Sequence, residues 1–331
     1  MKGESKNVYA SPDFRSTVGR SRARMRAFVG AAVLLPVLLV LACASSSPRP
    51  ASASAPSRGT LLIVGGGPIP DAILERFVAL SGGPGRARIV IYPMASESTD
   101  AGVELAETFI KLGASAERQV LTHEQADTDA AAASLADVTG IWFGGGDQSR
   151  LTAALLDTKV EAAIAARYRA GAAVGGTSAG AAVMSTPMLT GDEKKPGGDR
   201  PPAKDSSDAW MTIARENVVT ARGFALLPGA IVDQHFVRRR RNNRLLSLVL
   251  ENPGLVGVGI DESTALEVGP DGVWRVLGDS VAVVFDARKA ALTPAGARAL
   301  GAADVRLDVL PAGSTYDPKT GRAVLPALKP S

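Results

Sequence analysis

Cysteine and histidine are nearly missing from this chain of 331 residues, which contains one cysteine, Cys43, and two histidines, His123 and His235. A single cysteine excludes an intramolecular disulfide. So few histidines, with no structural cysteine, cannot build a usual zinc site, and we expect neither a metal nor another cofactor. The same scarcity leaves only two candidates for a histidine base.

The first 42 residues have the composition of an export signal. Five arginines between residues 15 and 26 precede an apolar segment at 27–42, which is shorter than the roughly 20 residues of a membrane span. The segment ends at Cys43, an arrangement that resembles the lipobox of bacterial lipoproteins. We therefore expect a lipid on Cys43 that anchors the exported protein to a membrane, facing the periplasm or at the cell surface. An ordinary signal peptide or a membrane anchor are the alternatives.

Two further expectations concern this leader. Met25 is an alternative start, because Met25-Arg26 and the apolar run already make a complete short signal. Residues 43–58 combine the lipidated cysteine with a flexible tether rich in Ser, Pro and Ala. The leader also carries the excess positive charge: residues 1–42 hold seven Lys/Arg and two Asp/Glu out of 37 and 33, which leaves 30 basic and 31 acidic residues. A nucleic-acid partner inferred from charge is thereby excluded.

Residues 59–331 are sufficient for one large domain. Short apolar runs alternate with segments of helical spacing, which predicts an α/β fold of three layers with a mostly parallel sheet between helices. In the last third, short strands separated by turn signals predict an antiparallel extension. The predicted strands are 61–64, 88–92, 117–121, 140–143, 172–175, 256–260, 264–268, 273–277 and 281–285, and the predicted helices are 71–80, 103–112, 126–135 and 160–170. Gly191–Asp208 is predicted to be a mobile surface loop, with a partial lid over the site as the alternative.

A nucleophile elbow is predicted at Gly176-Thr177-Ser178-Ala179-Gly180, which follows an apolar strand and enters a small-residue helix. Flanking glycines permit the strained turn that exposes Ser178. A packing turn or a phosphate loop is the alternative. The choice depends on whether the chain also supplies a base and an orienting acid.

His235 is the better candidate for the base. It ends an apolar run at Asp233-Gln234-His235, and polar groups at the end of a buried strand are where α/β sheets bind ligands. His123 lies in an exposed turn. The acid is Glu262 or Asp261 at the end of a further apolar strand, or a carboxylate of the predicted loop, Asp192 or Glu193. The chain order Ser, His, acid disfavours an ordinary lipase or esterase.

The oxyanion of an acyl-transfer intermediate needs backbone N–H donors beside the nucleophile. Ala179 follows Ser178 directly and supplies one. Gly146, in the segment Gly144-Gly145-Gly146-Asp147-Gln148, is expected to supply the second, while Asp147 is able to cap the following helix.

Four motifs in order resemble the cyanophycinase group of S51-type serine peptidases, which also contains aspartyl dipeptidase. They are Gly144–Gln148, Gly176–Ala182, Asp233–Phe236 and Gly259–Glu262. The resemblance implies a fold like that of class I glutamine amidotransferases, which is flavodoxin-like, and often a homodimer. It implies Ser178 as nucleophile, His235 as base, Glu262 as orienting acid, and Gln148, Asp233 and Gln234 as site residues.

An arginine-rich segment begins three residues after His235, at Arg238. Cyanophycinases carry arginines at offsets that correspond to Arg239, Arg241 and Arg244, where a guanidinium is suited to hold a carboxylate. Their substrate is a poly-aspartate with arginine on each side chain. The resemblance therefore implies cleavage of cyanophycin to β-Asp-Arg dipeptides through an acyl-enzyme. An aspartyl or isoaspartyl dipeptidase and a non-catalytic peptide-binding lipoprotein are the alternatives.

Overall fold

The computed structural model of the chain describes residues 58–193, 213–297 and 299–327. They belong to a unit that extends from Ala53 to Ser331. The predicted leader, the lipidation site Cys43, the tether up to residue 57 and residues 194–208 of the predicted loop lie outside the described residues.

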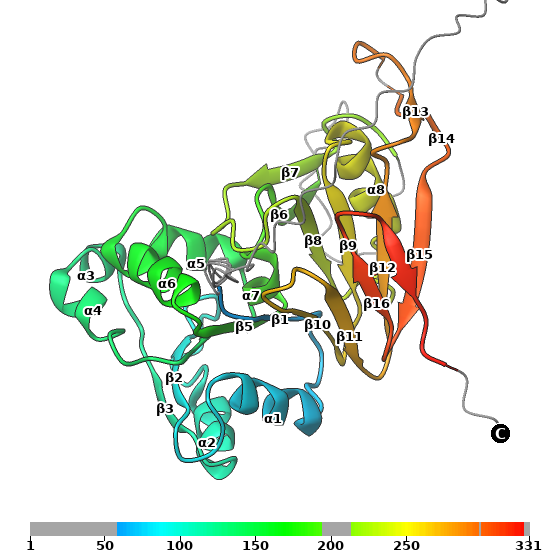
Figure 1. Cartoon of the computed structure of the whole chain (residues 1–331). Helices are drawn as coiled ribbons and strands as arrows, with labels where there is room; N and C mark the ends of the chain where they lie inside the picture. The colour runs from blue at the N-terminus through cyan, green and yellow to red at the C-terminus, as the bar shows by residue number, and fades with distance from the viewer. Residues whose placement is uncertain (1–57, 194–212, 298, 328–331) are drawn as a thin grey trace, which may run out of the picture. The chain divides into compact units, whose positions relative to one another are not determined.

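Nine strands form the larger sheet (Figure 1). They are β1 (Leu61–Val64), β2 (Arg88–Tyr92), β3 (Ser115–Arg118), β4 (Gly140–Phe143), β5 (Ala173–Thr177), β10 (Thr264–Val268), β11 (Trp274–Gly278), β16 (Thr315–Asp317) and β17 (Arg322–Val324). The order is β17-β16-β11-β10-β1-β5-β4-β2-β3. Pairing is parallel from β1 to β3 and antiparallel from β1 through β10 to β17. The carboxyl ends of β1, β4 and β5 therefore meet at one edge.

Helices cover both faces of the parallel part. Because side chains alternate along a strand, Leu61 and Ile63 of β1 pack on one face and Leu62 and Val64 on the other. The second face is covered by α1 (Asp71–Leu80) and α2 (Val103–Lys111). On the first face lie α5 (Gln148–Leu155), α6 (Lys159–Arg169) and α7 (Ala179–Ala182), with the short α3 (His123–Ala126) and α4 (Asp129–Ala133) beside them.

A second sheet is built from β8 (Ala230–Gln234), β9 (Val256–Ile260), β12 (Val281–Asp286) and β15 (Arg306–Pro311), in the order β15-β12-β9-β8. Only β8 and β9 are parallel to each other. The helix α8 (Asn242–Glu251) packs on this sheet. Two ribbons complete the fold, β6 (Met188–Glu193) with β7 (Val218–Ala221) and β13 (Ala291–Leu292) with β14 (Ala302–Ala303).

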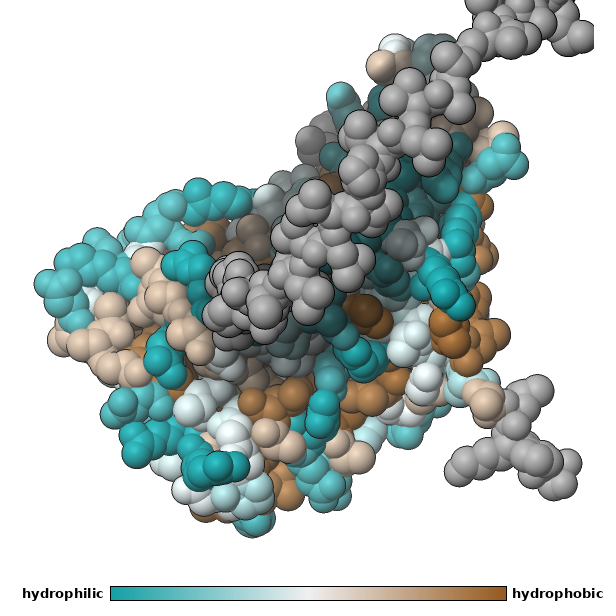
Figure 2. Space-filling model, in the orientation of Figure 1, coloured by the Kyte–Doolittle hydropathy of each residue, from teal (hydrophilic) through white to brown (hydrophobic). Residues whose placement is uncertain are grey.

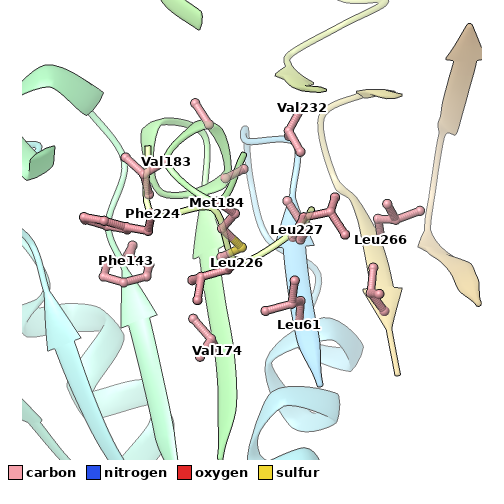
Figure 3. Close-up of a cluster of buried hydrophobic side chains, with 14 of the residues drawn as sticks. Leu61, Phe143, Val174, Val183, Met184, Phe224, Leu226, Leu227, Val232 and Leu266 are labelled. Carbon is pink, nitrogen blue, oxygen red and sulfur yellow. The ribbon is translucent and has the colours of Figure 1, made fainter. Parts of the chain in front are cut away.

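An apolar cluster joins the two sheets (Figure 3). Met184, just after α7, and Leu227 lie over Leu61 of the larger sheet, with Val232 of β8 close by. The N–H of Leu227 donates to the carbonyl of Met184 at 2.9 Å. Packing of this kind fixes the distance between the end of β5 and the end of β8, which carry the serine and the histidine.

The predicted fold class is confirmed: parallel strands lie between helices, and antiparallel strands follow in the C-terminal part. Several details differ from the prediction, among them the strand expected at 117–121, which is β3 at Ser115–Arg118. The helix expected at 126–135 is instead α3 and α4, because Thr122 and Thr128 each cap a separate helix with their hydroxyls. Residues 191–193 of the expected loop belong to β6, and Glu193 pairs with Val218 of β7. Strand β9, expected in an antiparallel extension, pairs in parallel with β8 and antiparallel with β12 in a separate second sheet, whereas β10 and β11 extend the larger sheet.

The surface is largely hydrophilic in the view of Figure 2, with separate hydrophobic patches. Exposed apolar side chains in the C-terminal strands include Leu307 and Val309 of β15 and Val324 of β17. Within the part of the chain that the structure describes, none of the helices has the length and apolar character to cross a membrane.

Candidate active site

Ser178 lies in the sharp turn between β5 and α7. Its backbone has φ 53° and ψ −109°, a region that residues other than glycine seldom adopt. The flanking glycines make the turn possible. A Cβ at Gly176 would lie 2.5 Å from the carbonyl oxygen of Gly180, and a Cβ at Gly180 would lie 2.2 Å from that of Phe143. The Gly-x-Ser-x-Gly spacing thus follows from close backbone packing at the carboxyl edge of the sheet.

The structure brings Ser178, His235 and Glu262 together in one hydrogen-bonded line. Oγ of Ser178 lies 2.8 Å from Nε2 of His235, and Nδ1 of His235 lies 2.7 Å from Oε1 of Glu262. In the neutral tautomer that suits this line, Nδ1–H donates to the carboxylate and Nε2 accepts from the serine hydroxyl. This is the geometry of a nucleophile, a base and an orienting acid.

The charge state of His235 suits a base. The side chain is buried, and burial is the main cause that lowers its pKa below the ordinary 6.5. The hydrogen bond to Glu262 acts in the opposite direction, while the positive charges of Arg239 and Arg241 lower the pKa further. The imidazole is consequently neutral at pH 7 and able to accept a proton.

A glycine turn after β1, Gly65-Gly66-Gly67, holds the base and the acid. The carbonyl of Gly65 accepts from the N–H of His235 at 2.7 Å. A Cβ at Gly66 would lie 2.3 Å from Cε1 of His235, and a Cβ at Gly67 would lie 2.8 Å from Cβ of Glu262. This turn was not predicted to belong to the site, although three consecutive glycines after a predicted strand indicate a close backbone approach.

Asp261 has a different partner from Glu262. Its Oδ1 accepts from the N–H groups of Val237 at 3.1 Å and Arg238 at 2.9 Å, and its Oδ2 accepts from the hydroxyl of Ser280 at 2.8 Å. The two carboxylates are adjacent in sequence after β9 but have separate hydrogen-bond partners. Glu262 therefore contacts the histidine, while Asp261 holds the turn that follows it.

The segment Gly144–Gly146 lies beside the nucleophile. A Cβ at Gly145 would lie 3.6 Å from Cβ of Ser178, and Gly146 adopts φ 137° with its Cα against the carbonyl of Ala95. Among the described residues, no acceptor binds the N–H of Gly146 or of Ala179. Both donors are available to an oxyanion formed at Ser178.

A cavity of about 190 Å³ opens next to Ser178. It is lined by residues from four segments: Gly146, Asp147, Gln148, Ser149, Ser178, Thr190, Gly191, Asp192, Gln234, His235, Arg239 and Arg241. Five of the expected oxyanion and substrate residues are therefore in it: Gly146, Gln148, Gln234, Arg239 and Arg241. Asp147 caps α5 by accepting from the N–H of Ser149 at 2.8 Å, as expected.

Two buried amides line this cavity. Nε2 of Gln148 donates to the carbonyl of Leu189 at 2.6 Å and so ties β6 to the start of α5. Oε1 of Gln234 is buried and has no donor among the described residues. A buried acceptor without a donor costs free energy, which a ligand that donates there would recover.

Asp233 and Arg244, expected to bind substrate, do not line the cavity. Both side chains are buried, and Nε of Arg244 lies 2.8 Å from Oδ2 of Asp233, with a second contact from Nη2 to Oδ1. Along β8 the side chain of Asp233 points away from that of Gln234, because successive residues of a strand face opposite sides. We therefore revise their role to that of an ion pair that anchors α8 to β8.

The sequence of the chain matches peptidase family S51 over residues 61–275. Two cyanophycinases are similar in sequence to this chain over most of its length. That of Trichormus variabilis is 35% identical over 266 residues, covering 77% of this chain and 83% of the relative, and that of Geminocystis herdmanii is 33% identical over 274 residues, covering 80% and 95%. The chain belongs to peptidase family S51. The S51 relationship makes it a serine-type peptidase.

A solved structure is consistent with this fold. The crystal structure of a peptidase from an acI-B1 Actinobacterium matches with a TM-score of 0.57 at 22% identity, and the match covers 79% of this chain and 98% of that one. At this identity the likeness concerns the fold. The family match over residues 61–275 includes the strands that carry the serine, the histidine and the acid in this S51 peptidase.

His123 lies apart from the nucleophile of the S51 fold. It begins α3, its Nδ1 lies 3.2 Å from the carbonyl of Ala153, and it lines a different cavity, of about 650 Å³. Of Asp192 and Glu193, the loop carboxylates considered for the acid, Asp192 lines the cavity beside Ser178, while the described contact of the histidine is with Glu262. In the described part of the chain, no cluster of three His, Cys, Asp or Glu side chains is arranged to hold a metal.

Proposed function

We propose that this protein hydrolyses aspartyl peptide bonds and that its substrate is cyanophycin, which it converts to β-Asp-Arg dipeptides. The hydrogen-bonded line from Ser178 through His235 to Glu262 carries the hydrolytic part of this proposal. The two arginines beside it, Arg239 and Arg241, support the acidic substrate, because a guanidinium suits carboxylates. Relatives named cyanophycinase support the choice of polymer.

The first half-reaction forms an acyl-enzyme. Oγ of Ser178 attacks the carbonyl carbon of the scissile bond while its proton passes to Nε2 of His235. The negative charge on the carbonyl oxygen is stabilised by the N–H groups of Ala179 and Gly146. Cleavage of the C–N bond follows, and the leaving amine takes the proton from Nε2 of His235.

The second half-reaction releases the product. Water gives a proton to Nε2 of His235 and its oxygen attacks the acyl carbon. Collapse of the tetrahedral intermediate returns the proton to Oγ of Ser178 and frees a carboxylate. Glu262 keeps the imidazole in the tautomer with Nδ1–H and stabilises the imidazolium in both half-reactions.

The substrate subsite includes Arg239, Arg241 and the amides of Gln148 and Gln234. Arg241 is buried and its Nη1 donates to the carbonyl of Gln234 at 2.8 Å, so its position is constrained before substrate binds. Preorganisation of this kind reduces the entropy lost on binding.

The experiment is an assay of the purified full-length protein on insoluble cyanophycin and on small Asp-X and isoaspartyl peptides, with Ser178→Ala as the control. We expect β-Asp-Arg dipeptides from the polymer and none from the variant. Release of product only from the small peptides would favour an aspartyl or isoaspartyl dipeptidase instead. No turnover of either, with Ser178→Ala binding peptide as the wild type does, would favour the non-catalytic binding protein.

We also propose that the protein is exported and held to a membrane by a lipid on Cys43. The arginines and the apolar segment at 27–42 before Cys43 support this. Labelling of cells with radioactive palmitate should mark the wild type and not Cys43→Ser. Labelling of neither, with the protein free in the medium, would indicate an ordinary signal peptide.

A further inference from the structure

The cavity beside Ser178 has a positive side and a negative side. Arg239 and Arg241 lie on the segment after β8, while Asp192 comes from β6. An acidic substrate alone accounts for the arginines but not for a carboxylate in the same small cavity.

A β-bulge places Asp192 there. Leu189 of β6 pairs with Thr220 of β7, and Glu193 pairs with Val218, so three residues of β6 stand opposite one of β7. These three, residues 190–192, all line the cavity, and Gly191 has φ 95°. Bulges often re-aim side chains next to active sites.

Contacts within the fold hold this bulge in place. Oγ1 of Thr190 lies 3.1 Å from the carbonyl of Val219, 3.3 Å from Oδ2 of Asp192 and 3.3 Å from the N–H of Asp192. On the side of the nucleophile, Gln148 binds the carbonyl of Leu189. The carboxylate of Asp192 has no ion pair with any described residue.

A second acceptor in the cavity points to the same ligand chemistry. Oε1 of Gln234 is buried without a donor among the described residues, and Gln234 lines the cavity together with Asp192. Oδ2 of Asp192 accepts one hydrogen bond, from Thr190, and Oε1 of Gln234 accepts none, so a carboxylate with remaining acceptor capacity lies with an unpaired amide oxygen. Together they suit a planar cation with several N–H groups, which is a guanidinium.

We propose that Asp192 binds the guanidinium of the substrate's arginine side chain and so selects arginine-bearing aspartyl polymers over plain aspartyl peptides. This rests on the proposed function. Each repeat of such a polymer carries a carboxylate and a guanidinium, and the cavity offers arginines to the first and Asp192 to the second. A charge-assisted hydrogen bond in a half-buried cavity favours the charged ligand by about 10- to 100-fold, since such bonds contribute about 1.5–3 kcal/mol.

The test compares two synthetic trimers of β-linked aspartyl dipeptides. The first carries arginine on each aspartate, and the second carries citrulline, which has nearly the same shape as arginine but no charge. Wild type should cleave the arginine trimer with a KM about 10- to 100-fold lower than the citrulline trimer. Asp192→Asn should raise KM for the arginine trimer by a similar factor, leave kcat within about threefold and barely affect the citrulline trimer. The control is Asp137→Asn, whose carboxylate is on the surface.

The outcomes separate this inference from the proposed function. Cleavage of both trimers by wild type with equal KM overturns the role of Asp192 and leaves the hydrolase standing. An equal loss of kcat on both trimers in Asp192→Asn also overturns it, because a structural or catalytic role would act on both. Cleavage of neither trimer by wild type overturns the proposed function and this inference together. If Asp192→Asn does not fold, Asp192→Glu replaces it, because it keeps the charge and moves the carboxylate by one methylene. KM should then rise for the arginine trimer and not for the citrulline trimer, and an equal change on both trimers overturns the inference.

Discussion

Gly66 packs directly against His235, so that a Cβ at Gly66 would lie 2.3 Å from Cε1 and 2.5 Å from Nε2 of the imidazole. The imidazole of His235 is therefore positioned by its close packing against Gly66, in the turn after β1, as well as by its hydrogen bond to Glu262. Gly66 also has φ 108°, which other residues rarely adopt.

Gly66→Ala should displace the imidazole and lower kcat/KM by at least about 100-fold, since misplacement by 1 Å is enough for a loss of that size. The measurement is kcat/KM on the polymer together with thermal unfolding of the same sample. Gly254→Ala is the matched control, because a Cβ there meets nothing within 4 Å. Wild-type kcat/KM in Gly66→Ala would contradict the role of this contact.

Glu262→Gln and Asp261→Asn should have different effects. Loss of the carboxylate on Nδ1 of His235 should lower kcat by about 10²–10⁴-fold, the upper value being the known effect in chymotrypsin-type enzymes. Asp261→Asn keeps the triad and weakens the turn after His235, so the free energy of unfolding should fall more than kcat. The measurements are kcat and the free energy of unfolding in urea for both variants. A larger loss of kcat in Asp261→Asn than in Glu262→Gln would contradict these roles.

The pH dependence of acylation should follow His235. The neutral imidazole is the active form and its pKa is lowered below the ordinary 6.5, so the midpoint of the acidic limb should lie below pH 6.5. Arg239→Gln removes a charge that lowers this pKa and should move the acidic limb to higher pH. The rate of labelling by a neutral serine reagent measures this without involving substrate binding. An unchanged limb in Arg239→Gln would show that this charge does not act on the base.

The ion pair between Asp233 and Arg244 should contribute more to the folding stability of the protein than to substrate binding. Arg244→Met removes the main partner of the buried carboxylate of Asp233 and leaves it only the longer ion pair with Arg241 at 3.9 Å, so the free energy of unfolding should fall by about 3 kcal/mol. The double variant Asp233→Leu/Arg244→Met should recover most of this loss. In comparison, Arg88→Met in the exposed pair with Asp137 should cost about 1 kcal/mol or less. Equal effects of Arg244→Met and Arg88→Met in urea unfolding would refute the assignment.

Local pattern predicted much of this fold. The bounds of β1, β2, β4, β9 and β10 agree with the apolar runs, because strands buried on both faces have continuous apolar sequences. The elbow at Ser178 and the strand ends at His235 and Glu262 were recognisable for the same reason. Each stands where a buried strand stops at polar residues.

The features that depend on distant pairing were not predictable in this way. The bulge that turns Asp192 into the cavity exists only because Leu189 and Glu193 pair with Thr220 and Val218 across a long connection. The burial of Arg244 against Asp233 likewise requires α8 to lie on β8. A run of arginines in the sequence does not distinguish Arg244, which is buried, from Arg239, which faces the cavity.

The central claim is that Ser178 is the nucleophile and His235 its base. Treatment of the purified protein with a fluorophosphonate, followed by peptide mass spectrometry, tests it most directly. We expect one adduct, on Ser178, that is absent in Ser178→Ala and slowed by at least about 100-fold in His235→Ala. An adduct on another serine that accompanies loss of activity, or undiminished turnover by Ser178→Ala, would contradict it.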